Sequence, residues 1–141
     1  LDAKHGHASA ERAISGAGLA DLHAALVALD GAAADPLDAA GVTQAALDAH
    51  EPRAVEALNL MCAFLGTVCG DLALTLGARG GVYLAGGILP RLGTFLDDSP
   101  FRARFEAKGR FTDYLAGIAT LLIVADDPPA LRGAERALDA G

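Results

Sequence analysis

The longest apolar pattern in the chain lies between residues 52 and 78. Apolar side chains recur there at alternating spacings of three and four residues, and neighbours widen the stripe: Val55, Leu58, Met61, Cys62, Phe64, Leu65, Val68, Cys69, Leu72 and Leu76. This period predicts one long helix packed in a core. Pro52 suits its first turn, and we place its end near Ala78. A membrane span is the weaker interpretation, because Asp71 would cost roughly 3 kcal/mol near a bilayer centre.

Shorter helices are predicted on both sides of the long one. Ser9 suits the N-cap of a helix through Ile14, which the glycine-containing residues 15–18 interrupt. A leucine stripe then predicts a helix that ends near Asp30, followed by a loop over residues 31–42. The remaining predicted helices cover residues 43–50, residues 90–96, a segment opened by Ser99-Pro100 with Phe101 and Phe105 on one face, and residues 130–140.

Two short apolar runs predict strands. Residues 82–85 lie between two glycine pairs, and residues 120–125 (TLLIVA) precede an Asp-Asp-Pro-Pro turn. Near-continuous apolar runs of this length are typical of buried strands. The helical connection between them predicts a parallel pair in an α/β fold that is otherwise mostly helical. Two strands alone do not make a stable sheet, so we expect a partner chain to complete it or the chain to contain only part of it.

The glycine pair after the first strand is the best candidate for a ligand contact. Gly86 and Gly87 let the backbone turn with no Cβ in the way, so a ligand can approach the carboxyl end of the strand. Ligands of open α/β sheets bind at that end, often beside the next helix. Glycine pairs are also ordinary turn chemistry, so this motif alone leaves both interpretations open.

Composition and charge narrow the classes of function. The chain has 141 residues, 52% of them hydrophobic, which is enough for one domain with an aliphatic core. Its net charge of −7 offers no basic patch for nucleic acid or for an anionic membrane surface, so we expect neither partner and a cytoplasmic protein. Cys62 and Cys69 lie about 10 Å apart along the helix, too far for a disulfide. From the absence of metal-ligand spacing and of a leader-like segment, we expect no metal site and no signal peptide.

Four segments together resemble the C-terminal part of bacterial glucokinases. They are GHASAERAISGAGL (6–19), GGVYLAGGILPRL (80–92), SPFRARFEAKGRF (99–111) and TLLIVADDP (120–128), in matching order and spacing. This family belongs to the sugar kinase, Hsp70 and actin superfamily. The resemblance implies a partial actin-like ATPase (ribonuclease H-like) large domain over residues 1–129. It also implies a terminal helix over residues 130–141 that returns to the small domain, with the N-terminal domain absent from this chain.

The resemblance further implies an activity for the parent protein. Glucokinases phosphorylate glucose to glucose 6-phosphate with ATP and Mg²⁺, so glucose and ATP are the expected partners. The general base and the main phosphate loop of the family lie upstream of this chain. We therefore expect no catalytic residue and no metal ligand here, and no activity of the fragment alone. An unpaired strand edge favours association, and we expect a homodimer.

Candidate binding residues are carried over position by position. Glu11 matches a glutamate that binds glucose hydroxyls, a role that suits the lone pairs of a carboxylate. The pair Gly86-Gly87 matches the adenosine motif of the family, and Ile88 beside it is expected to wall the nucleotide. The turn Ser15-Gly16 is expected to border the same cleft.

Two alternatives remain open. A non-catalytic nucleotide-binding relative of another sugar kinase would carry the same glycine-bearing strand but would not need Glu11. A helical interaction module without enzymatic activity would use the glycines only as a turn. From the residues alone, Glu11 is a solvated helical carboxylate beside Arg12.

Overall fold

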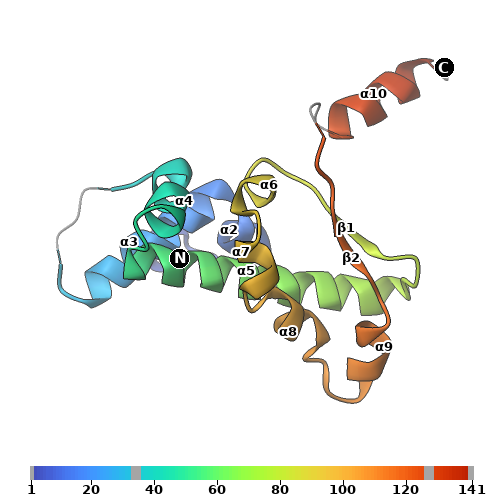
Figure 1. Ribbon diagram of the computed structural model, residues 1–141, viewed down its shortest axis with the longest axis horizontal. Helices are drawn as coiled ribbons and strands as arrows, with labels where there is room; N and C mark the ends of the chain where they lie inside the picture. The colour runs from blue at the N-terminus through green and yellow to red at the C-terminus, as the bar shows by residue number, and fades with distance from the viewer. Residues whose placement is uncertain (1, 33–35, 126–128, 140–141) are drawn as a thin grey trace.

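The computed structural model describes residues 2–32, 36–125 and 129–139. Its elements, in chain order, are α1 (Asp2–His5), α2 (Ala10–Ile14), α3 (Gly16–Leu29), α4 (Ala39–Leu47), α5 (Pro52–Leu76), β1 (Val82–Leu84), α6 (Leu89–Leu92), α7 (Phe95–Asp98), α8 (Phe101–Glu106), the 3-10 turn η1 (Gly109–Phe111), α9 (Thr112–Ala116), β2 (Thr120–Leu122) and α10 (Pro129–Asp139). Figure 1 shows α5 running through the body of the molecule, with the other helices of the body arranged around it.

The predicted long helix is confirmed as α5. Pro52 occupies its first turn, and Gly77 ends it in the left-handed conformation (φ 60°), so that the helix stops slightly before the predicted Ala78. The helix is long and apolar enough to cross a membrane, but 44% of its most apolar window is buried against other parts of the protein. Because α3, α4 and α8 all pack on α5, it is the central core helix of this fold.

The burial expected along α5 is only partly correct. The buried side runs from Ala54 to Ala73 and includes Leu58, Met61 and Cys62. Leu72 and Leu76, which we expected to face the core, are 54% and 76% exposed. They lie in the last turns of the helix, on a side that no described element covers.

The backbones of α8 and α5 touch directly where the two helices cross. An ideal Cβ on Gly66 would lie 2.1 Å from the carbonyl oxygen of Phe101, and one on Gly70 would lie 2.5 Å from that of Phe105. Only glycine permits backbone atoms to approach so closely. The rings of Phe101 and Phe105 are then buried with their centroids 6.3 Å apart. Lys108 locks this crossing, because its Nζ donates to the carbonyl oxygen of Thr67 at 3.0 Å.

The predicted strands form a parallel pair, but they are shorter and less buried than expected. β1 and β2 pair with Val82 opposite Thr120 and Leu84 opposite Leu122, in a two-stranded sheet. Leu84 is buried, whereas Tyr83 on the opposite face is 62% exposed. The expectation of strands buried on both faces is therefore wrong for the described residues, because the face that carries Tyr83 and Leu121 is exposed. The turn expected at residues 126–128 lies outside the described residues.

Two predicted helices begin or break at other places than expected. The helix placed at residues 43–50 starts earlier, as α4, because the Asp38 carboxylate caps it by accepting a hydrogen bond from the Gly41 N–H at 2.8 Å. The helix placed at residues 90–96 splits into α6 and α7 at Gly93, whose φ of 54° interrupts the helical backbone. The Ser9 cap is confirmed, since its Oγ accepts a hydrogen bond from the Arg12 N–H at 3.3 Å.

The first and last helices are held very differently. α1, which the pattern did not predict, is tied to α3 because Asp21 bonds both His5 and Lys4. These hydrogen bonds lower the pKa of Asp21, and the bond with His5 has the larger effect. α10 confirms the predicted terminal helix, but Figure 1 shows it projecting away from the body, and its Leu131 and Leu138 are exposed.

Glu51 fixes the start of α5. Its carboxylate accepts hydrogen bonds from the backbone N–H groups of Arg53 at 3.1 Å and Ala54 at 2.5 Å. Partial burial alone would raise the pKa of Glu51, but these bonds and the imidazole of His23, 3.6 Å away, outweigh it. The pKa of Glu51 is therefore lowered from its ordinary value of 4.5.

The glycine at the helix crossing can be tested by adding one methyl group. Gly66→Ala should lower the free energy of unfolding by about 1–3 kcal/mol or more, because the new Cβ would overlap the Phe101 backbone. Gly80→Ala is the matched control, since a Cβ at Gly80 meets no described atom within 4 Å. Urea unfolding of the 141-residue chain measures both. Equal stability of the two variants would show that the crossing tolerates a side chain.

The cap at Glu51 should give a pH-dependent contribution to stability. Because its pKa is lowered in the folded state, the contribution is complete above pH 4.5 and is lost as the pH falls through the folded-state pKa. Glu51→Ala should therefore cost about 0.5–2 kcal/mol near neutral pH. The difference from the wild type, measured by urea unfolding, should shrink as the solution is acidified. A difference that stays constant down to acidic pH would contradict the cap.

Candidate functional site

A pocket of about 410 Å³ lies where the start of α3, the middle of α5 and the turn after β1 meet. Its lining residues are Ile14, Ser15, Gly16, Met61, Leu65, Ala85, Gly86, Gly87, Ile88 and Leu89. The structure thus brings all the nucleotide candidates of the sequence, which are far apart along the chain, to one place. A volume of this size is in the range of small-molecule sites, roughly 300–1,000 Å³.

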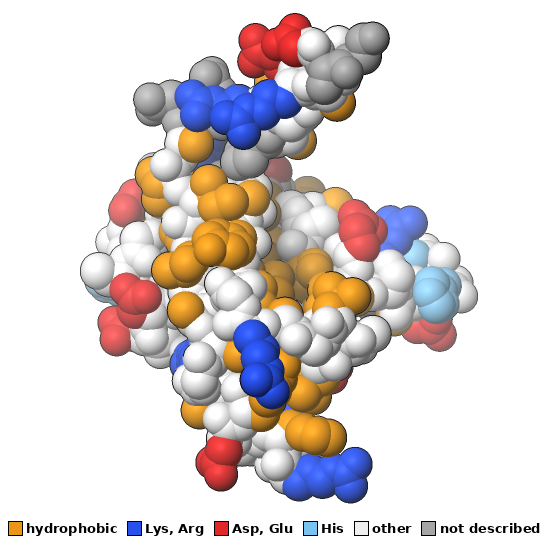
Figure 2. All heavy atoms as spheres, turned by 90° about the vertical axis from the view of Figure 1, so that its right-hand side faces the viewer, with side chains coloured by type: hydrophobic (Ala, Val, Ile, Leu, Met, Phe, Trp, Pro, Cys, Tyr) orange, Lys and Arg blue, Asp and Glu red, His pale blue; other side chains and the backbone are white. Residues whose placement is uncertain are grey.

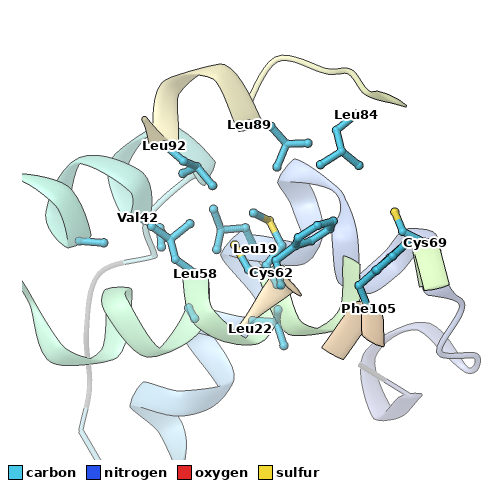
Figure 3. Packing of buried hydrophobic residues seen from close by; sticks show 14 of the residues in the cluster. Leu19, Leu22, Val42, Leu58, Cys62, Cys69, Leu84, Leu89, Leu92 and Phe105 are labelled. Atoms are coloured by element: carbon cyan, nitrogen blue, oxygen red, sulfur yellow. The ribbon is translucent and has the colours of Figure 1, made fainter. Parts of the chain in front are cut away.

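The glycine turn is held between two anchors. Leu84 precedes it and Leu89 follows it, and both side chains are buried. In Figure 3 they point from the turn toward the core around Phe105. Because its two ends are fixed in this way, the backbone between them is presented to the pocket as a defined wall.

The glycines of this turn leave space that a side chain would take. Gly86 has φ 138°, which residues with a side chain rarely adopt, so the turn itself requires glycine there. At neither Gly86 nor Gly87 would an added Cβ meet a described atom within 4 Å. The open space beside both residues is what a ligand lying against this backbone needs.

The opposite wall is built by the junction of α2 and α3. Ser15 leaves the helical conformation, and its Oγ caps α3 by accepting a hydrogen bond from the Gly18 N–H at 3.1 Å. A Cβ on Gly18 would lie 2.0 Å from the carbonyl oxygen of Arg12, so this glycine lets α3 begin directly against α2. Gly16 then faces Ile88, whose Cδ1 lies 3.7 Å from the ideal Cβ position of Gly16.

Glu11 lies outside the lining of this pocket. It is exposed in the first turn of α2, three residues before Ile14, and residues at that spacing share a face of a helix. Within the described part of the chain, no hydrogen bond or ion pair engages its carboxylate. Glu11 is therefore next to the pocket on α2 and available to a ligand, and it does not pair with Arg12.

Met61 and Leu65 line the pocket but carry no sequence signal of a site. Both were placed on the core side of the long helix, and Met61 is indeed only 1% exposed. The apolar period gave no sign that these side chains also reach a pocket, because a side chain that faces the core and one that faces an apolar cavity have the same pattern.

The remaining chemistry of the described residues is limited. Burial raises the pKa of both thiols, Cys62 and Cys69, so they stay protonated and are poor nucleophiles. Over residues 2–32, 36–125 and 129–139, no group of three or more His, Cys, Asp or Glu side chains is placed to hold a metal ion. The glycine turn and the apolar side chains that line the pocket are suited to binding and orienting a ligand.

The fold agrees with part of a solved enzyme structure. A crystal structure of glucokinase from an Antarctic psychrotroph matches 99% of this chain with a TM-score of 0.85 and 38% sequence identity, and the chain covers 43% of it. The described residues therefore form part of a glucokinase-type fold, mostly helical with two parallel strands.

Sequence comparisons then give the family. The sequence model of the Glucokinase family matches residues 1–140. Glucokinase from Aromatoleum aromaticum is 54% identical over 139 residues, which are 99% of this chain and 42% of that protein. Glucokinase from Nitrobacter hamburgensis is 54% identical over 125 residues, 89% of this chain and 39% of that protein. The chain belongs to the glucokinase family, which confirms the resemblance seen in its motifs, and it spans less than half the length of these relatives.

Proposed function

We propose that the full-length protein containing this chain is an ATP-dependent glucokinase that phosphorylates glucose to glucose 6-phosphate. The observation that carries the proposal is the convergence of Ser15-Gly16 and Gly86-Gly87 with Ile88 in one pocket, in a chain of the glucokinase family. Phosphoryl transfer depends mainly on holding donor and acceptor in line, so a rigid wall for one substrate and a nearby carboxylate for the other suit it.

In this proposal Glu11 holds the sugar. Its exposed carboxylate, which no described residue engages, can accept hydrogen bonds from sugar hydroxyls, and its position one turn before Ile14 suits a sugar bound beside the nucleotide pocket. Gly86-Gly87 and Ile88 hold the nucleotide, with the Ser15-Gly16 turn across from them. The proton of the attacking hydroxyl is taken by a residue outside this chain, as the family resemblance implies.

Mg²⁺ bound to the phosphates of ATP would neutralise their charge. The described residues present no carboxylate cluster that fits such an ion, so we assign no metal contact to them.

The proposal extends to the architecture of the whole protein. Residues 1–129 are the later portion of an actin-like, ribonuclease H-like large domain, and residues 130–141 return to the small domain. The projecting α10 with its exposed leucines suits a helix that packs on another part of the polypeptide.

We further propose a cytoplasmic homodimer. Figure 2 shows hydrophobic side chains on the face below α10, and the exposed Tyr83, Leu121 and Leu76 could contribute to such a contact.

The fragment and the full-length protein should differ in activity. The 141-residue chain should form no ADP above background when given glucose and ATP, because it lacks the general base expected upstream. The full-length protein should form ADP only when glucose is present. A coupled assay measures both, with a contaminating kinase excluded by a mock purification. Turnover by the fragment would contradict the division of roles, and inactivity of the full-length protein would contradict the proposed function.

Two substitutions in the full-length protein should separate the two substrate sites. Glu11→Gln should raise the glucose KM about ten- to a hundredfold, since charge-assisted hydrogen bonds contribute roughly 1.5–3 kcal/mol. It should leave the ATP KM nearly unchanged. Gly87→Val should do the reverse, because its side chain enters the open space beside the turn without meeting a described atom near its Cβ. An unchanged glucose KM in Glu11→Gln would return Glu11 to the role of a solvated carboxylate.

A further inference from the structure

One side of the pocket comes from neither the glycine turn nor the α2–α3 junction. Met61 and Leu65 lie four residues apart on α5, and both line the pocket. Met61 is almost fully buried, and Leu65 is partly buried and packs against the core. The floor of the pocket is therefore the body of the central core helix.

We propose that the nucleoside part of the bound nucleotide rests on Met61 and Leu65. On this floor the phosphoryl donor is selected by its shape and apolar area, without side-chain hydrogen bonds to the edge of the base. This inference rests on the proposed function, since it names how the same pocket chooses its nucleotide.

The chemistry of the lining supports this mode of selection. Among the described residues that line the pocket, Ser15 provides the one polar side chain, and its Oγ already accepts the Gly18 N–H. The other lining side chains are aliphatic or are absent at glycine, apart from the thioether of Met61. Apart from the Ser15 hydroxyl, which caps α3, these walls offer a nucleobase apolar contact area and no side-chain donor or acceptor that separates adenine from guanine.

The floor is also rigid before any ligand arrives. Leu65 precedes Gly66, where the α8 backbone presses directly on α5, and Met61 is packed in the core. Because core packing holds α5 in place, the helix cannot shift away from the pocket when one of its lining side chains is made larger. A substitution that fills this floor should therefore be felt by the nucleotide.

The ratio of the affinities for an adenine and a guanine nucleotide tests the proposal. A site built on apolar contacts separates related ligands by roughly 10- to 200-fold, whereas a site that hydrogen-bonds a distinguishing group separates them by about 10⁴-fold or more. The non-hydrolysable β,γ-imido analogues of ATP and GTP differ at the base edge but have the same phosphates. In the full-length protein with glucose present, competition binding should give affinities for the two that differ by less than about 200-fold. A larger ratio would overturn the proposal.

Variants of Leu65 test the floor itself. Leu65→Phe should weaken binding of both analogues in parallel, by about tenfold or more, while leaving glucose affinity unchanged. Leu60→Phe is the matched control, because Leu60 is also partly buried on α5 but is not among the lining residues, and its nucleotide affinity should stay as in the wild type. Leu65→Ala, which opens the floor, serves if the Phe variant does not fold, and it should also weaken both analogues. Thermal melts report folding of each variant.

The outcomes separate this inference from the proposed function. Wild-type nucleotide affinity in a folded Leu65 variant overturns the inference even if the wild type phosphorylates glucose. Weakened binding in that variant upholds the floor even if the wild type binds both analogues and phosphorylates no glucose, in which case the proposed function fails. A wild type that binds neither analogue overturns both.

Discussion

The contact of two helix backbones, α5 and α8, is the constraint on which the rest of this structure depends. At Gly66 and Gly70 there is no room for even one carbon between the helix and the carbonyl oxygens of Phe101 and Phe105. Backbone contact of this kind buries the two phenyl rings and fixes the direction in which the chain continues to β2. Arg102 reinforces that path, since its guanidinium donates to the carbonyl oxygens of Ile118 at 2.8 Å and Ala116 at 2.9 Å, just before the strand.

The same helix gives the site its geometry. α5 meets α8 on its Gly66 side, and at Met61 and Leu65 it closes the bottom of the pocket. The glycine turn lies across the pocket from this floor. Its two ends are held by the buried side chains of Leu84 and Leu89, so the core fixes the position of its backbone. Binding residues on a rigid support keep their geometry at low cost in conformational entropy. The residues that form the core therefore also shape the candidate site.

Periodicity predicted the elements better than it predicted their surroundings. The long helix and the parallel strands follow from spacing alone, but Leu72 and Tyr83 proved exposed, because a pattern tells which face is apolar and not what covers it. The break at Gly93 depends on one residue's φ. For the site, the sequence around the glycine pair indicated a turn that can contact a ligand. That Ser15-Gly16 lies at the same pocket was expected only from the family resemblance. Met61 and Leu65 were missed because a core pattern does not distinguish a cavity wall from packed interior.

Met61 belongs to the core and also lines the pocket, and this couples ligand binding to folding. Its side chain reaches the pocket only when α5 is packed, so a molecule resting on it binds the folded chain and has no equivalent site on the unfolded one. Binding of this kind raises the free energy of unfolding by about 1.4 kcal/mol for each tenfold excess of free ligand over its Kd. Under the proposed nucleotide binding, the stability of this core would depend on the concentration of the free nucleotide.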